Sequence, residues 1–194
     1  MNQVFKTLLR STVVATGLLT AAGVAAQNSA SIGAATFNTE GELLLPEGFR
    51  EWVFVGAPLT PHGLNNGKAG FPEYHHVYVN PDAFGVYQRT GEFPDGTVIA
   101  KELVLLQKGD FEDGSKNAPS GRGFFAGEFQ GMDVMVKDSV RFKATNGWGF
   151  FNFGHHAPPY VKASRAAAAE SCASCHSANA GKGMVFKAYY PVLR

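Results

Sequence analysis

The chain contains only two cysteines among its 194 residues, Cys172 and Cys175. A disulfide between two cysteines so close in sequence would close a very small ring and stabilise little of a fold. Charged residues make up only 17% of the chain, the formal net charge is +1, and lysine and arginine form no cluster. The composition therefore excludes a disulfide scaffold and gives no electrostatic basis for nucleic-acid binding.

Long apolar runs are also lacking, except at residues 11–26 (STVVATGLLTAAGVAA). This run follows Lys6 and Arg10 and ends in small residues, which indicates a signal peptide cleaved after Ala26. A transmembrane helix needs about 20 apolar residues, so the run is short for one, although a retained anchor stays as the alternative. We expect an exported, periplasmic protein with no membrane span after signal removal.

The rest of the chain has the size of one domain. We expect a signal peptide at 1–26, a flexible leader at 27–35 and a single domain at 36–194.

Helical patterns are few, whereas glycine and phenylalanine are abundant, with 23 and 16 copies. One helix is expected from Pro81 to about Thr90, and the alanine-rich residues 162–175 predict another. The sequence thus predicts a mainly β (α+β) fold, an antiparallel β-sheet domain with a few short helices, one of them near the C-terminus. The predicted strands are residues 51–55, 76–79, 97–106, 123–130, 132–136, 148–153 and 184–190.

The two cysteines belong to the motif Cys172-Ala173-Ser174-Cys175-His176, which is the attachment pattern of c-type haem. In this motif both thiols bond covalently to the porphyrin and the histidine becomes the proximal iron ligand. A thioredoxin-like redox pair would require a βαβ pattern that the flanking sequence lacks. We therefore predict one haem c per chain, with iron bound by His176.

A zinc site is the other alternative for the cysteines, and it would need two further ligands. The histidine pairs His75-His76 and His155-His156 are the candidates for such ligands. We favour the haem motif because it coincides with the export signal.

Methionine is scarce, and a second axial ligand of the kind that electron carriers use is not evident. Beyond the signal peptide the chain has only Met132, Met135 and Met184. Met184 follows His176 too closely to reach the opposite haem face easily, and the other two lie in a strand-like run. We therefore expect a five-coordinate iron with an open distal side, where small molecules bind or react.

The whole region predicted to be mature resembles the cytochrome P-460 family, the hydroxylamine-oxidising c-type cytochromes. The resemblance includes GELLLPEGFREWVFVG at 41–56, TGEFPDGTVIAKELV at 90–104, CASCH at 172–176 and MVFKAYYPVLR at 184–194. It implies a mainly antiparallel β domain that forms a homodimer. It also implies oxidation of hydroxylamine, with nitric oxide chemistry, to nitrous oxide or nitrite, and transfer of electrons to a soluble cytochrome c.

The resemblance further implies that Lys101 is bonded through its amine to the haem rim. From the residues alone, Lys101 interrupts an apolar strand in phase with Ile99 and Leu103, where a buried lysine is costly unless paired. The alternative is an edge-strand lysine that faces solvent and pairs with Glu102 or a neighbouring residue. We predict Lys101 as a catalytic and cofactor-binding residue.

The chain departs from the family pattern at the position of a distal arginine, where it has His75. We predict His75 and His76 as catalytic proton-transfer residues, with surface or packing roles as the alternative. Before the haem motif the nearest carboxylate is Glu170. For His155 and His156 an exposed loop is favoured over the rim of the haem pocket.

A second function stays open, namely that of a nitric oxide- or carbon monoxide-binding protein like the β-sheet cytochromes c′. These share the fold without the lysine bond and line the distal pocket with phenylalanine. The candidates in this chain are Phe71, Phe84, Phe93, Phe124 and Phe125. The presence of Lys101 favours the hydroxylamine-oxidising enzyme over the gas-binding protein.

Overall fold

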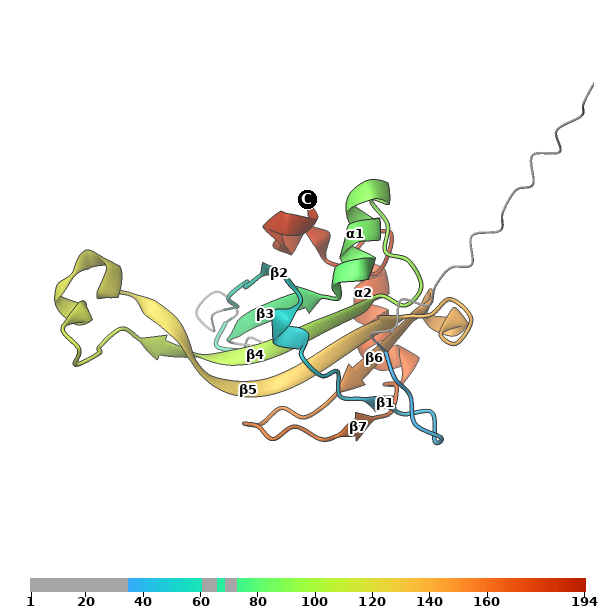
Figure 1. Ribbon diagram of the computed structural model, residues 1–194, viewed down its shortest axis with the longest axis horizontal. Helices are drawn as coiled ribbons and strands as arrows, with labels where there is room; N and C mark the ends of the chain where they lie inside the picture. Colours follow the sequence, from blue (N-terminus) through green and yellow to red (C-terminus); the bar gives the residue numbers. More distant parts are fainter. Residues whose placement is uncertain (1–34, 61–65, 69–72) are drawn as a thin grey trace, which may run out of the picture.

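The computed structural model describes residues 35–60, 66–68 and 73–194, and within them one antiparallel sheet dominates (Figure 1). Its strands lie in the order β2-β3-β4-β5-β6. They are β2 (Val53–Gly56), β3 (Tyr74–Val79), β4 (Val98–Lys108), β5 (Phe124–Lys137) and β6 (Trp148–Asn152). A second, two-stranded sheet pairs β1 (Leu43–Leu44) with β7 (Ala163–Ser164).

The helical elements are short, and the predicted mainly β class is confirmed. Helix α1 spans Pro81–Thr90, as expected from the proline at its start, and Gly91 ends it in the left-handed region. Near the C-terminus, the short π-helix η6 (Ala169–Ala173) leads into helix α2 (Ser174–Asn179). The remaining helical elements are 3₁₀ turns: η1 (Phe49–Glu51), η3 (Ser115–Asn117), η4 (Pro119–Gly121), η5 (Lys143–Thr145), η7 (Lys187–Tyr189) and η8 (Pro191–Leu193).

The two faces of the main sheet carry separate apolar cores, because side chains alternate along each strand. One core includes Val77 and Ile99 of the sheet and packs against α1 and the C-terminal turns. The other includes Ala100 and Val134 and packs against the N-terminal segment around Leu43. In Figure 1, α1 and the C-terminal turns accordingly lie on one side of the sheet, with β1 and β7 on the other.

Strands β4 and β5 extend beyond their neighbours and form an arm that ends in η3 and η4 (Figure 1). Pairing continues along the arm to Lys108 opposite Phe124. The predicted strands 123–130 and 132–136 are thus one continuous strand, β5.

The predicted helix over residues 162–175 is wrong in its first half. Residues 163–164 form β7, and the N–H of Ala167 donates to the carbonyl of Phe150 at 2.7 Å. Alanine has high helix propensity, but pairing with β1 and β6 provides hydrogen-bond partners for the backbone N–H and C=O groups while the segment is extended. Helical structure begins only at Ala169.

The predicted strand over residues 184–190 is also wrong. Met184 has a positive φ of 62°, which interrupts an extended chain, and η7 and η8 follow. The rings of Phe186 and Tyr189 stack at 5.0 Å, a contact that one 3₁₀ turn provides. The aromatic residues of this segment pack individually and do not alternate across a sheet.

The predicted signal peptide and the leader, apart from Ala35, lie outside the described residues. Within the part of the chain that the structure describes, no helix has the length and apolar character to cross a bilayer.

Candidate haem site

A cavity of about 500 Å³ lies between the main sheet, η6 and α2, and the C-terminal turns. Its walls are mostly apolar and include Val77, Ile99, Phe150, Val185, Phe186 and Tyr190. The CxxCH residues, Lys101 and His75 also line it. A volume of this size and character is typical of cofactor sites.

His176 lies on the cavity wall with its ring orientation fixed. The Nδ1 atom is 2.7 Å from the carbonyl oxygen of Met184, so Nδ1–H donates and Nε2 is the nitrogen left to bind a metal. The rings of Phe150 and Phe186 pack against the imidazole in T-shaped contacts, with centroids 4.8 and 4.9 Å from that of the imidazole. Burial lowers the pKa of His176, the Met184 carbonyl opposes this, and the charge of Lys101 adds to it. The neutral ring is the form that binds iron.

Cys172 and Cys175 are free thiols that line the same cavity. Cys172 lies in η6 and Cys175 in the first turn of α2, so one winding of chain presents both thiols and His176. The π-helical turn of η6 is wider than an α-helical turn, and short π-helical segments are frequent at functional sites.

Lys101 faces the cavity from the central strand of the sheet. Its Nζ atom lies 2.9 Å from a carboxylate oxygen of Asp133, and the Lys101 side chain is 23% exposed. Glu102 points to the opposite face, where it is fully buried and accepts hydrogen bonds from Arg50 and Tyr160. The alternative of an edge-strand lysine is wrong in its strand position, because β4 is the central strand. The partner of Lys101 is Asp133 of the neighbouring strand and not Glu102.

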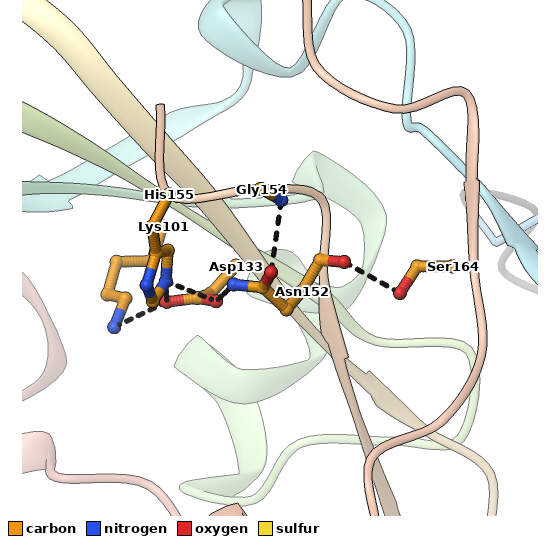
Figure 2. Close-up of polar contacts among 6 residues, drawn as sticks. All are labelled: Lys101, Asp133, Asn152, Gly154, His155 and Ser164. Atoms are coloured by element: carbon orange, nitrogen blue, oxygen red, sulfur yellow. Dashed lines mark hydrogen bonds and ion pairs between the residues drawn. The ribbon is translucent and has the colours of Figure 1, made fainter. Parts of the chain in front are cut away.

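Asp133 connects Lys101 to a chain of polar contacts at the cavity wall (Figure 2). Its carboxylate accepts a hydrogen bond from Asn152 Nδ2 at 2.7 Å and lies 3.2 Å from His155 Nε2. Burial would raise the pKa of Asp133, but the Lys101 charge and the Asn152 and Lys101 hydrogen bonds outweigh it, so this pKa is lowered. Sequence reasoning missed both Asp133 and Asn152. The available signal was that Asp133 interrupts an apolar strand, as Lys101 does.

The structure separates the two adjacent histidines of β3. His75 lines the cavity, opposite Leu103 in register. His76 lies on the other face, opposite Glu102, and its ring packs against Phe54 at 6.0 Å. The position of His76 fits the packing alternative, so only His75 of the pair is placed for a role at the cavity.

Of the remaining candidates from the sequence, His155, His156 and Glu170, only His155 lines the cavity. His155 is exposed, as expected for the loop, but it also lines the cavity. His156 is exposed and contacts the carbonyl of Ala157. Glu170 is exposed and is not part of the cavity wall.

Met184 lies on the His176 side of the site, because its carbonyl accepts from the His176 ring. It is therefore not placed to bind iron opposite His176. Met132 is fully buried in the core on the other sheet face, whereas Met135 lines the cavity.

The phenylalanines proposed for a distal pocket lie elsewhere. Phe84 and Phe93 belong to the core around α1, and Phe124 and Phe125 belong to the arm. Phe71 lies outside the described residues. Among the described residues, the phenylalanines that line the cavity are Phe150, Phe151 and Phe186.

These donors fit a covalent haem c better than a bare metal ion. One oriented imidazole and two free thiols line an apolar cavity, the set that c-type haem requires. Among the described residues, three or more histidine, cysteine, aspartate or glutamate side chains nowhere gather in a group that could hold a metal ion.

Comparison with known proteins agrees with this geometry. The family model of cytochrome P460 matches residues 46–187, which include the cavity strands, Lys101 and the CxxCH motif. No curated protein matches the chain significantly. Because the match covers most of the sequence, the chain belongs to the cytochrome P460 family of c-type haem proteins with oxidoreductase chemistry.

Proposed function

We propose that the protein is an exported haem enzyme that oxidises hydroxylamine, with nitric oxide chemistry, to nitrous oxide or nitrite. Electrons would leave to a soluble cytochrome c, and the chain would act as a homodimer in the periplasm. The observation that carries this proposal is the position of Lys101 in the same cavity wall as the CxxCH residues.

In this proposal His176 would bind the iron through Nε2, and Cys172 and Cys175 would hold the porphyrin through thioethers. Haem supplies the redox centre when it is bound. The Met184 carbonyl fixes the imidazole ring, and Phe150 and Phe186 pack against it. These contacts hold the His176 ring in one orientation, with Nε2 as the nitrogen that would bind iron.

In the proposed enzyme Lys101 would provide a third covalent bond to the haem. A bond at the haem rim distorts the macrocycle and changes its electronics, which is one of the means by which a protein tunes haem reactivity. The backbone of Lys101 is fixed, because β4 is the central strand and pairs with a strand on each side.

Oxidation of hydroxylamine removes protons together with electrons, so a proton acceptor is needed at the cavity. His75 is the sequence candidate that lines the cavity, and we propose it for this role. His76 is not included, because it faces the opposite side of the sheet.

Peptide mapping by mass spectrometry tests the proposal. The proteolytic peptide that contains Lys101 is expected to remain bonded to the haem-bearing Cys172–Cys175 peptide. Lys101→Ala is expected to lose the red-shifted ferrous absorbance band and hydroxylamine turnover while retaining thioether-bound haem. Lys108→Ala, on the exposed part of the same strand, is the matched control and should resemble the wild type.

If the two peptides of the wild type separate freely, the proposal of a lysine-linked, hydroxylamine-oxidising enzyme is contradicted. Tight binding of nitric oxide or carbon monoxide without turnover would then identify the gas-binding function.

A further inference from the structure

The carboxylate of Asp133 forms an ion pair with Lys101 and lies directly opposite it on the adjacent strand. The two residues are register partners on β4 and β5, so their side chains share a face, and Nζ and Oδ2 are 2.9 Å apart. Both side chains are about three-quarters buried, with 23% and 25% exposed, and both line the cavity. This ion pair therefore lies at the site itself.

Asp133 is itself fixed by the next strand and the loop that follows it. Asn152, its register partner on β6, donates Nδ2–H to Oδ1 at 2.7 Å, and His155 Nε2 lies 3.2 Å from the same oxygen. Asn152 is held in turn, since its Oδ1 accepts from the Gly154 N–H and its carbonyl accepts from Ser164 (Figure 2). The carboxylate consequently has little freedom to move.

A lysine side chain has four rotatable bonds, and an ammonium group is strongly hydrated, so an unrestrained Lys101 would populate many rotamers. A charge-assisted hydrogen bond to a fixed carboxylate selects the rotamers that keep Nζ at the cavity wall. Positioning of this kind matters most for a bond that forms at one defined atom.

We propose that Asp133, held by Asn152 and His155, is the positioning residue that aims the amine of Lys101 at the haem rim. The inference rests on the proposed function, because it concerns the lysine bond of that enzyme. The role of Asp133 is to orient the Lys101 amine, and Asp133 does not bind the iron.

The bond-forming step also needs an acceptor for protons. Two N–H bonds of the Lys101 ammonium and one C–H bond of the rim are replaced by one N–C bond, which releases three protons and two electrons. With a peroxide as the oxidant, both electrons and two of the protons end in two water molecules. The remaining proton goes to Asp133, the carboxylate already in contact with Nζ. The positive charge of Lys101, which helps to keep the pKa of Asp133 low, disappears in the same step.

The test compares haem-loaded wild type with Asp133→Asn, Asp133→Glu and Asn152→Ala, all matured as c-type cytochromes. Mass spectrometry measures the fraction of the haem-bearing Cys172–Cys175 peptide that also carries the Lys101 peptide, before and after hydrogen peroxide is added. Asp133→Asn is expected to lower the rate of linkage by about tenfold to a hundredfold, the range that misplacement of a reacting group causes. Thioether attachment should not change. Asp133→Glu should restore part of the linkage because it keeps the charge.

Asp110→Asn is the matched control, since it removes an exposed aspartate that pairs with Lys116 on the arm, and it should link like the wild type. Equal linkage in Asp133→Asn and wild type would overturn the positioning role alone. A wild type with thioethers but no Lys101 linkage would overturn the proposed enzyme and the positioning role together. If Asp133→Asn fails to mature, Asn152→Ala decides: slower linkage with intact thioethers supports the role, and wild-type linkage overturns it.

Discussion

Adjacent residues of β4 have opposite surroundings, because successive side chains of a strand point to opposite faces. Lys101 faces the cavity and Asp133, whereas Glu102 is fully buried against Arg50 and Tyr160. The Glu102 contacts bind β4 to the segment around η1 and to the loop that contains Tyr160. They hold the strand from its far side and so stabilise the orientation of Lys101.

Substitution Glu102→Gln is expected to destabilise the fold. It removes the charge from two hydrogen bonds to Arg50, at 3.0 and 2.6 Å. Hydrogen bonds to charged groups contribute about 1.5–3 kcal/mol, and we expect a loss of about 2 kcal/mol in the free energy of unfolding. Urea denaturation followed by fluorescence measures it. Glu128→Gln, at an exposed position of the arm, should change the free energy little, and an equal loss in both variants would contradict the explanation.

The ion pair of Asp133 predicts a pH dependence. The pKa of Asp133 is lowered in the folded protein from the ordinary value of 3.8. A group with a lowered folded pKa adds stability above its unfolded pKa, and that stability is lost as the pH falls through the folded pKa. In the haem-free chain, where Lys101 keeps its charge, the wild type should therefore be more stable than Asp133→Asn at pH 7, and the difference should shrink below pH 3.8. Denaturation at several pH values measures this, and a difference independent of pH would contradict it.

At the scale of elements, pairing overrides local propensity in the segment before the haem motif. Residues 162–168 are rich in alanine, yet they run extended along β1 and β6. This path delays helical structure to Ala169, so that η6 and α2 begin where the cysteines must face the cavity.

The arm is an element that the cavity does not need. No residue between Lys101 and Asp133 lines the cavity, and Lys108 and Phe124 are register partners at the base of the tip. Replacing residues 109–123 with Asn-Gly should close the two strands by a tight hairpin turn. Haem attachment and the absorbance spectrum are expected to match the wild type. Loss of haem from this variant would show that the arm contributes to the site, and size-exclusion chromatography would show whether the proposed dimer depends on it.

At the scale of the whole molecule, the cavity joins elements from most of the described chain, from β3 to the C-terminal turns. An apolar cavity of about 500 Å³ leaves its walls without packing partners unless a group fills it. Haem is therefore expected to be part of the core of the mature protein as well as its reactive centre.

The double substitution Cys172→Ser and Cys175→Ser should remove covalent haem and lower the thermal stability. We expect a fall in Tm of about 10 °C or more, since each kcal/mol shifts Tm by about 2–4 °C in a domain of this size. Differential scanning calorimetry measures the change. Ser177→Ala, at an exposed position of α2, is the control, and an unchanged Tm in the cysteine variant would contradict a structural role for haem.

The prediction from sequence was most accurate where local chemistry is decisive. The Pro81 start of α1 and the alternation of β4 are local signals, and both predicted the observed elements. The segments 162–168 and 184–190 were predicted wrongly, because long-range pairing and packing around His176 decide their conformation. Asp133 escaped notice for the same reason: its importance depends on which residue of β4 it faces.

The sequence by itself determined the haem motif, the mainly β class and the membership of the family, because each depends on residue identity and spacing along the chain. Only the tertiary structure decided that Lys101 faces the cavity, that His75 and His76 lie on opposite faces, and that Asp133 contacts the Lys101 amine. Strand order and register determine these contacts, and they arise from the packing of both sheet faces at once.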